Sequence, residues 1–173
     1  MTRPITIIFC FTLLSSTVFG QRTPEELGRI AFNCFQKNQL DSFFKLKPTV
    51  SELTELGKNY GIDTTSDQYK DFLIRYPVVI KNFKERCKKL LEDSAELGFS
   101  WTTAKIDTIE ASTKTLSLDN PDPKNKPVII TIIDVYILSN DKRFKLTLGD
   151  AALYNGIWKP GNNIYFSRHK NTN

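Results

Sequence analysis

The spacing of apolar residues changes near Phe99, and this change most constrains what the chain can fold into. Before Phe99, apolar residues recur every three or four positions, which is typical of amphipathic helices. After it, they alternate with polar residues or form β-branched runs, which is typical of strands. Helices followed by strands indicate an α+β fold, with N-terminal helices packed on a curved antiparallel sheet. The 173 residues suffice for one domain with a single core.

The N-terminal half carries several helix signals. Residues 23–26 (Thr-Pro-Glu-Glu) and 49–52 (Thr-Val-Ser-Glu) each place a threonine three residues before a glutamate, the capping-box pattern of a helix beginning. Between them, 40–46 is predicted to be a short helical segment. Pro77 is predicted to begin the longest helix, which runs to Leu97. We expect this long helix to lie against the concave face of the sheet.

The C-terminal half predicts about four antiparallel strands. A first strand is expected over 99–118, with a bulge near 109–111. Residues 128–138 form a nearly continuous β-branched run, which predicts a central strand covered on both faces. Another strand is expected over 143–154, and Asn155-Gly156 predicts a tight hairpin turn. The remaining segments are a turn-rich loop and two short strands, over 120–127, 157–159 and 164–166.

Residues 1–20 have the pattern of a secretory signal peptide. Arg3 supplies the positive charge, residues 5–19 form an apolar region interrupted only by Thr, Ser and Cys, and Gly20 places a small residue before a predicted cleavage ahead of Gln21. The apolar stretch of about 15 residues is short of the roughly 20 that cross a bilayer, although a retained anchor is the alternative. We therefore expect a single mature domain, 21–173, that is secreted or periplasmic and has no transmembrane anchor.

Cleavage leaves Cys34 and Cys87 as an even pair in a compartment that can be oxidising. Both cysteines lie on apolar faces of predicted helices. A disulfide between them would close a loop of roughly 50 residues and contribute about 4 kcal/mol to stability. The alternative is two buried thiols that never meet. Spacing in the sequence leaves both alternatives open.

Composition argues against several functions. The net charge is +5, but acidic residues interrupt the densest basic run, Lys81 to Lys89, so a solvated helix face explains it better than a nucleic-acid surface. The single histidine, His169, lies in a polar tail, which leaves a Ser-His-Asp site unsupported. We expect neither a metal nor a cofactor. Trp101 and Trp158 are predicted to fill the core rather than to form ligand platforms.

Several segments together carry a family resemblance: 23–26 with Phe32 and Phe35, 46–49, the strand from Val128, the strand with Leu146, Leu148 and Asp150, and the turn 155–159. With them, the mature chain resembles the nuclear-transport-factor-2-like (cystatin-like roll) superfamily, in the form found among exported bacterial proteins. The resemblance implies a cone-shaped roll with a pocket between sheet and helices, often in a homodimer. Some members of that superfamily are isomerases or dehydratases, and others bind small molecules or partners. No catalytic motif of the enzymatic members matches here.

Two aspartates on the predicted central strands form the most suggestive polar group. A three-residue hairpin loop would place Tyr136 opposite Leu146. Asp134 would then lie opposite Leu148 and diagonally from Asp150. Two carboxylates in an apolar setting raise at least one pKa, as acid–base catalysis requires. A one-residue slip, a bulge, or a lysine or arginine on a neighbouring strand would remove that property.

These observations predict an exported, non-catalytic binding or interaction domain whose pocket takes a small apolar ligand, a peptide or a second subunit. The alternative is an isomerase- or hydratase-type enzyme. In that alternative Asp134 or Asp150 would act as the base and Tyr136 or Tyr154 as a hydrogen-bond donor. The enzyme hypothesis requires these four side chains to converge on one cavity.

Overall fold

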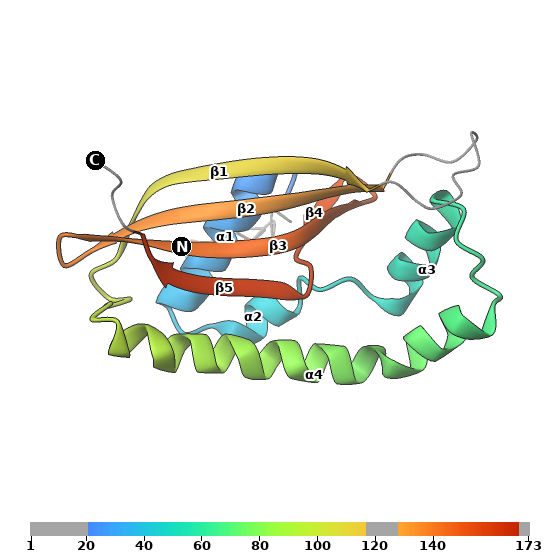
Figure 1. Ribbon diagram of the computed structural model, residues 1–173, viewed down its shortest axis with the longest axis horizontal. Helices are drawn as coiled ribbons and strands as arrows, with labels where there is room; N and C mark the ends of the chain where they lie inside the picture. Colours follow the sequence, from blue (N-terminus) through green and yellow to red (C-terminus); the bar gives the residue numbers. More distant parts are fainter. Residues whose placement is uncertain (1–20, 117–127, 170–173) are drawn as a thin grey trace, which may run out of the picture.

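In the described residues of the computed structural model, four helices precede a five-stranded antiparallel sheet, which confirms the α+β class (Figure 1). The structure describes residues 21–116 and 128–169. The predicted signal peptide and the predicted loop 120–127 lie outside them. The helices are α1 (Pro24–Gln36), α2 (Leu40–Phe44), α3 (Val50–Asn59) and α4 (Asp67–Glu96). The strands are β1 (Lys105–Leu116), β2 (Val128–Ser139), β3 (Lys142–Tyr154), β4 (Ile157–Lys159) and β5 (Asn163–Arg168).

Both predicted capping boxes are present. The Thr23 hydroxyl accepts a hydrogen bond from the Glu26 amide at 3.2 Å, and the Glu26 carboxylate accepts one from the Thr23 amide at 3.3 Å. Thr49 and Glu52 make the equivalent pair at 3.2 and 2.7 Å. These contacts satisfy amides that have no partner in the first helical turn, so α1 and α3 begin where the sequence predicts.

The prediction that Pro77 begins the longest helix is wrong. α4 begins earlier, at Asp67, and Pro77 lies inside it. An internal proline removes one backbone hydrogen bond, at a cost of about 3 kcal/mol. Tyr69, Tyr76 and Phe83 are buried at helical spacing on both sides of the proline. The stabilisation from this burial offsets the cost of the missing hydrogen bond, so the helix continues past Pro77.

The sheet is built around β3. One edge of β3 pairs with β2, which in turn pairs with β1, and the other edge pairs first with β5 and then with β4. β1 begins at Lys105 rather than near Phe99, and its bulge lies between Ile106 and Thr108 rather than at 109–111. The residues before β1 turn instead, because the Gln36 side chain of α1 donates hydrogen bonds to two of their carbonyls.

α1, not α4, covers a face of the sheet (Figure 1). Ile133 and Val135 of β2 are buried beneath it, and a Cβ at Gly28 would come within 2.9 Å of Ile133, so the glycine permits the close approach. Alternate β2 residues such as Ile132 are half-buried on the other face, so the expectation of two covered faces is also wrong. In Figure 1, α4 runs along the β5 edge.

α4 joins the core through α2. The Phe83 ring lies 5.8 Å from that of Phe43 and 6.2 Å from that of Phe44. This aromatic contact explains why the long helix lies beside the sheet instead of over it. Among the helices of the described residues, none is both long and apolar enough to span a membrane.

Candidate functional site

A groove of about 440 Å³ lies between α3 and the β3–β4 hairpin. This volume falls in the range of small-molecule sites, roughly 300–1,000 Å³. Its lining includes four large apolar side chains: Leu56, Ile129, Leu153 and Trp158. Carboxylates and phenols complete the lining: Glu52, Glu55, Tyr60 and Tyr154. Trp158 is half-buried: it packs against the hydrophobic core, as the sequence predicts, and it also lines this groove.

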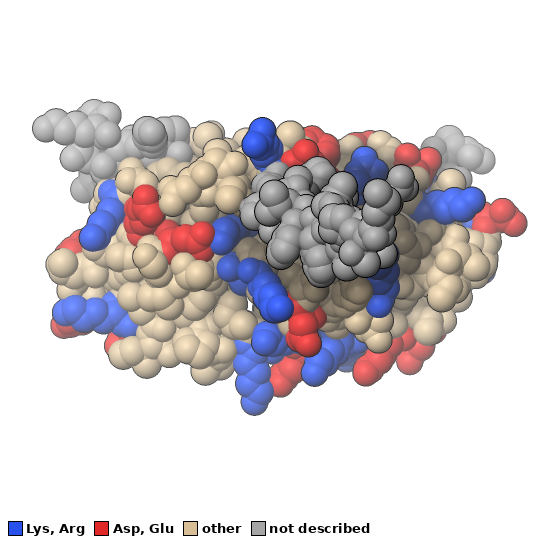
Figure 2. Space-filling view, turned by 180° about the vertical axis from the view of Figure 1, so that it is seen from behind, with Lys and Arg blue, Asp and Glu red and all other residues tan. Residues whose placement is uncertain are grey.

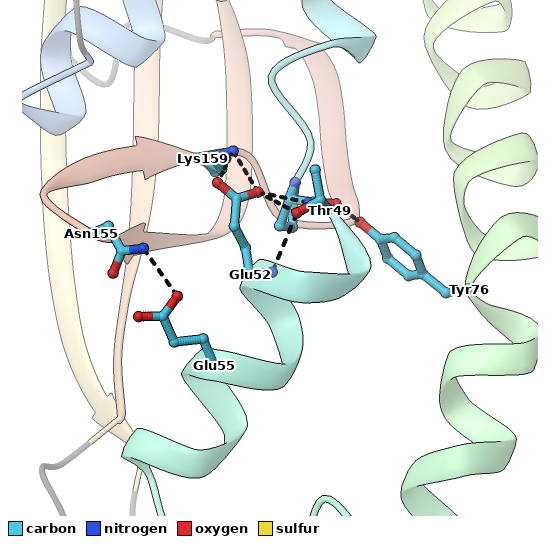
Figure 3. Close-up of polar contacts among 7 residues, drawn as sticks. Thr49, Glu52, Glu55, Tyr76, Asn155 and Lys159 are labelled. Carbon is cyan, nitrogen blue, oxygen red and sulfur yellow. Dashed lines mark hydrogen bonds and ion pairs between the residues drawn. The ribbon is translucent and has the colours of Figure 1, made fainter.

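α3 packs lightly against the rest of the molecule, which leaves the groove open. Gly57 is the one fully buried residue of this helix. Its apolar side chains Leu53 and Leu56 are only half-buried. Because α3 buries so little apolar surface, polar contacts to the hairpin contribute much of what holds it in place (Figure 3).

The first of these contacts is an ion pair between Glu52 and Lys159. The Lys159 ammonium lies 2.6 Å from one oxygen of the Glu52 carboxylate and 2.7 Å from the other. Burial pushes the pKa of Glu52 upward, but hydrogen bonds from Lys159 and Thr49 together outweigh it, and the pKa lies below its ordinary value. Glu52 is therefore ionised at neutral pH, and Lys159 compensates its charge.

The second contact joins Glu55 to the hairpin turn. The Asn155 side-chain amide donates to the Glu55 carboxylate at 3.1 Å (Figure 3). Asn155 and Gly156 have φ angles of +49° and +79°, which confirms the predicted tight turn. No ion pair among the described residues involves Glu55, and the residues that line the groove include no lysine or arginine. Within the part of the chain that the structure describes, no cationic side chain therefore compensates the Glu55 charge.

Two buried tyrosines lie beside the Glu52 end of the site. The Tyr76 hydroxyl of α4 donates to the Pro48 carbonyl at 2.7 Å, and burial, with the nearby Glu52 charge, raises the pKa of Tyr76 to about 12. Tyr154 is 9% exposed, and burial raises its pKa as well, with Tyr76 adding to the effect. Both phenols stay protonated at neutral pH, so each is a hydrogen-bond donor rather than a base.

The hairpin between β2 and β3 has a register that differs from the prediction by one residue. Ser139 pairs with Lys142 across a two-residue turn, Asn140-Asp141, whose φ angles are +51° and +58°. Tyr136 therefore lies opposite Lys145 rather than Leu146. The reason is that two residues with left-handed φ make a turn matching the strand twist, so the third loop residue joins β3.

The same register places Asp134 opposite Thr147 rather than Leu148, on the sheet face away from α1. Its carboxylate accepts hydrogen bonds from Lys145 at 3.2 Å and from the Thr147 hydroxyl at 2.5 Å. Tyr136 lies beside it, under the guanidinium of Arg143 at 4.5 Å. The expected apolar setting for Asp134 is absent, because a lysine on the neighbouring strand pairs with it.

Asp150 lies at the point where β3 changes partner from β5 to β4. Its φ is +56°, and its carboxylate accepts a hydrogen bond from the Asn163 side chain. The backbone of Gly161 crosses close by, since a Cβ there would collide with the Asp150 carbonyl oxygen. Asp150 therefore shapes a bend. Of the four residues that the enzyme hypothesis requires, Tyr154 alone lines the groove.

Both cysteines are free and buried, so of the two alternatives that the sequence leaves open, the structure has the two separate thiols. Burial raises the pKa of Cys87 to about 12 and also raises that of Cys34. Both side chains are thus thiols rather than thiolates at neutral pH, and they behave as small apolar residues of the core.

Sequence reasoning missed Lys47, which fixes the connection into α3. Its side chain is buried, with 7% of the residue exposed. The ammonium donates to the Gly161 carbonyl and the Asn162 side-chain oxygen, both at 2.7 Å, and lies 4.3 Å from the centre of the Phe83 ring. Burial lowers the pKa of Lys47 to about 8. A lone lysine before Pro48 gave no signal of this role.

Charged side chains elsewhere on the surface are mixed in sign. Figure 2 shows lysine and arginine side chains interspersed with acidic ones on the face opposite to that of Figure 1. In α4, Lys81 lies 3.9 Å from Glu85, which fits the solvated helix face expected from the sequence. Among residues 21–116 and 128–169, no group of three side chains is placed to hold a metal ion.

Comparison with known proteins adds no further constraint: no family model, no curated protein and no solved structure matches this chain. The resemblance to the nuclear-transport-factor-2-like superfamily stays a prediction. The functional assignment therefore depends on the geometry of the groove and on the chemistry of the side chains that line it.

Proposed function

We propose that the protein is an exported, non-catalytic binding domain that takes a small ligand with an apolar body into the groove between α3 and the β3–β4 hairpin. One observation carries the proposal: the groove keeps large apolar side chains accessible beneath a lightly packed helix. Leu153 is 40% exposed there, and Ile129 is 39% exposed. Covering such side chains releases about 25 cal/mol for each Å² removed from water.

The polar residues of the groove support binding over catalysis. Glu52 is held ionised and paired by Lys159, so it is a weak base. Tyr154 is protonated and is a poor acid, because burial raises its pKa. The two aspartates of the enzyme hypothesis lie elsewhere, Asp134 in an ion pair and Asp150 in a bend. Groups of this kind orient a ligand and do not exchange protons with it at neutral pH.

The large apolar side chains of the groove form its apolar floor: Leu56, Ile129, Leu153 and Trp158. A substitution in this floor tests the proposal. Leu153→Asp should weaken binding of the neutral probe N-phenyl-1-naphthylamine at least about tenfold, because it removes apolar area and adds a charge. Leu138→Asp is the matched control, since Leu138 is 44% exposed and does not line the groove. Probe fluorescence gives both dissociation constants. Equal affinities for the two variants, or no binding by the unmodified protein, would refute the proposal.

The proposal keeps three features that the sequence predicts. Export is supported by the charged and apolar pattern of residues 1–20. Membership of the nuclear-transport-factor-2-like superfamily is supported by a helix that covers one face of an antiparallel sheet. A homodimer is supported by apolar side chains of α4 that stay exposed, with Ile74 at 74% and Val78 at 57%.

A further inference from the structure

We infer that the ligand of the groove is a small organic cation, with an ammonium group attached to an apolar body. This inference rests on the proposed function and adds the charge of the ligand to it. Three aromatic side chains line the groove together with two carboxylates, and among the described residues no lysine or arginine does so. The aromatic residues are Tyr60, Tyr154 and Trp158.

The charges of the two carboxylates are not equivalent. Glu52 lies within 2.7 Å of the Lys159 ammonium through both of its oxygens, so its charge is compensated. Glu55 receives one hydrogen bond, from the neutral amide of Asn155, among the contacts of the described residues. Among residues 21–116 and 128–169, the Glu55 charge therefore has no cationic partner. An uncharged ligand would fill the apolar part of the groove without interacting with this charge.

The aromatic side chains select the same kind of ligand. A cation within about 6 Å of an aromatic ring centre is attracted to the ring face. The protein makes this contact elsewhere, for example with Lys47 at 4.3 Å from the Phe83 ring and Arg143 at 4.5 Å from the Tyr136 ring. An inorganic cation would gain nothing from the apolar floor, and its strong hydration disfavours entry. An organic ammonium ion matches all three features: the apolar floor, the aromatic rings and the Glu55 carboxylate.

Two probes of the same shape and different charge test the inference. Phenyltrimethylammonium carries the positive charge, and tert-butylbenzene replaces its nitrogen with carbon. Titration of the protein with each probe, followed by tryptophan fluorescence and by NMR, gives the two dissociation constants. We expect the cation to bind roughly tenfold more tightly, as a cation–ring contact beside a carboxylate provides. Potassium at equal ionic strength should not displace it.

Glu55→Gln removes the charge and keeps an oxygen that can accept the Asn155 hydrogen bond, so the wall of the groove is retained. In this variant the preference for the cation should fall to about threefold or less, while tert-butylbenzene binds as before. Glu96→Gln, at the far end of α4, is the control for the same loss of charge and should leave the preference unchanged. Tyr60→Leu should also lower the preference, because it removes one ring.

The outcomes separate this inference from the proposed function. Equal affinity for the two probes overturns the cationic ligand and leaves the binding groove in place. Failure of both probes to bind overturns the inference together with the binding function. If the preference for the cation is unchanged in Glu55→Gln, a group other than Glu55 recognises the charge of the ligand, and this too overturns the inference.

Discussion

Lys47 makes the stability of this protein depend on pH in an unusual direction. Its pKa falls from the ordinary value of 10.5 to about 8, because the ammonium is buried. Between these two values the unfolded chain binds more protons at this side chain than the folded protein does, so stability rises with pH. The full difference corresponds to about 3 kcal/mol, of which about 2 kcal/mol is gained between about pH 7 and pH 9.5.

The Lys47→Met variant isolates this effect. Methionine keeps an apolar chain against Phe83 and has no titrating group, so any constant contribution from lost hydrogen bonds cancels in a comparison across pH. The other titratable neighbour, the Cys87 thiol, stays protonated in this range because its pKa is raised to about 12, and Arg86 keeps its charge throughout. Tyr76 begins to matter only above about pH 10, which sets the upper limit of the experiment.

Urea unfolding at a series of pH values supplies the measurement. The free energy of unfolding of the unmodified protein should rise, relative to Lys47→Met, by about 2 kcal/mol from about pH 7 to pH 9.5. Lys88→Met replaces an exposed lysine of α4 and should track the unmodified protein at every pH. A constant difference between the unmodified protein and Lys47→Met would refute the reasoning, since it would mean that burial does not shift the titration of Lys47.

Two further predictions concern the core. Gly28→Ala should destabilise the protein by about 1–3 kcal/mol in urea unfolding, because the added Cβ would come within 2.9 Å of Ile133, although alanine is the better helix former. An increase in stability would show that α1 can move away from the sheet without loss. Cys34 and Cys87 should react with a thiol reagent only after unfolding, and their reaction at the rate of an exposed thiol in the folded protein would contradict their burial.

The elements that the sequence predicts correctly are those fixed by local chemistry. The capping boxes of Thr23 and Thr49 and the turn at Asn155-Gly156 depend on residues three positions apart or fewer. The sequence does not predict the beginning of α4 correctly, because the local preference of proline for a helix start is outweighed by tertiary packing. Burial on both sides of Pro77 outweighs the missing hydrogen bond, and no window around that residue contains this information.

The candidate site shows the same limit at longer range. Glu52 and Lys159 are 107 residues apart, and Glu55 and Asn155 are 100 residues apart, so neither contact leaves a pattern in the sequence. For Tyr154, the only signal in the sequence is the alternation of the strand that contains it. The register of the β2–β3 hairpin was missed by one residue, because the sequence accommodates both a two-residue and a three-residue loop. That single step is enough to change the neighbours of Asp134.

The contacts that shape the groove also decide how α3 can move. Its N-terminal end is held by Lys47 and by the Tyr76 hydroxyl on the Pro48 carbonyl. Further along, the single hydrogen bond from Asn155 holds Glu55 to the hairpin. A ten-residue helix is marginal by itself in water, so its docking depends on these partners.

An ammonium ligand would lie beside the Glu55 carboxylate, whose second oxygen is not used by Asn155, while burying Leu56 and Leu153 against its apolar body. Ligand binding and the docking of α3 onto the hairpin are therefore coupled, because the ligand adds apolar contacts to a helix that makes few of them in the free protein. A ligand that binds the docked helix alone stabilises it in proportion to the logarithm of its concentration. Amides of α3 should then gain protection from hydrogen exchange with ligand, while those beneath α1 stay unchanged, because Gly28 and Ile133 are already in close contact there.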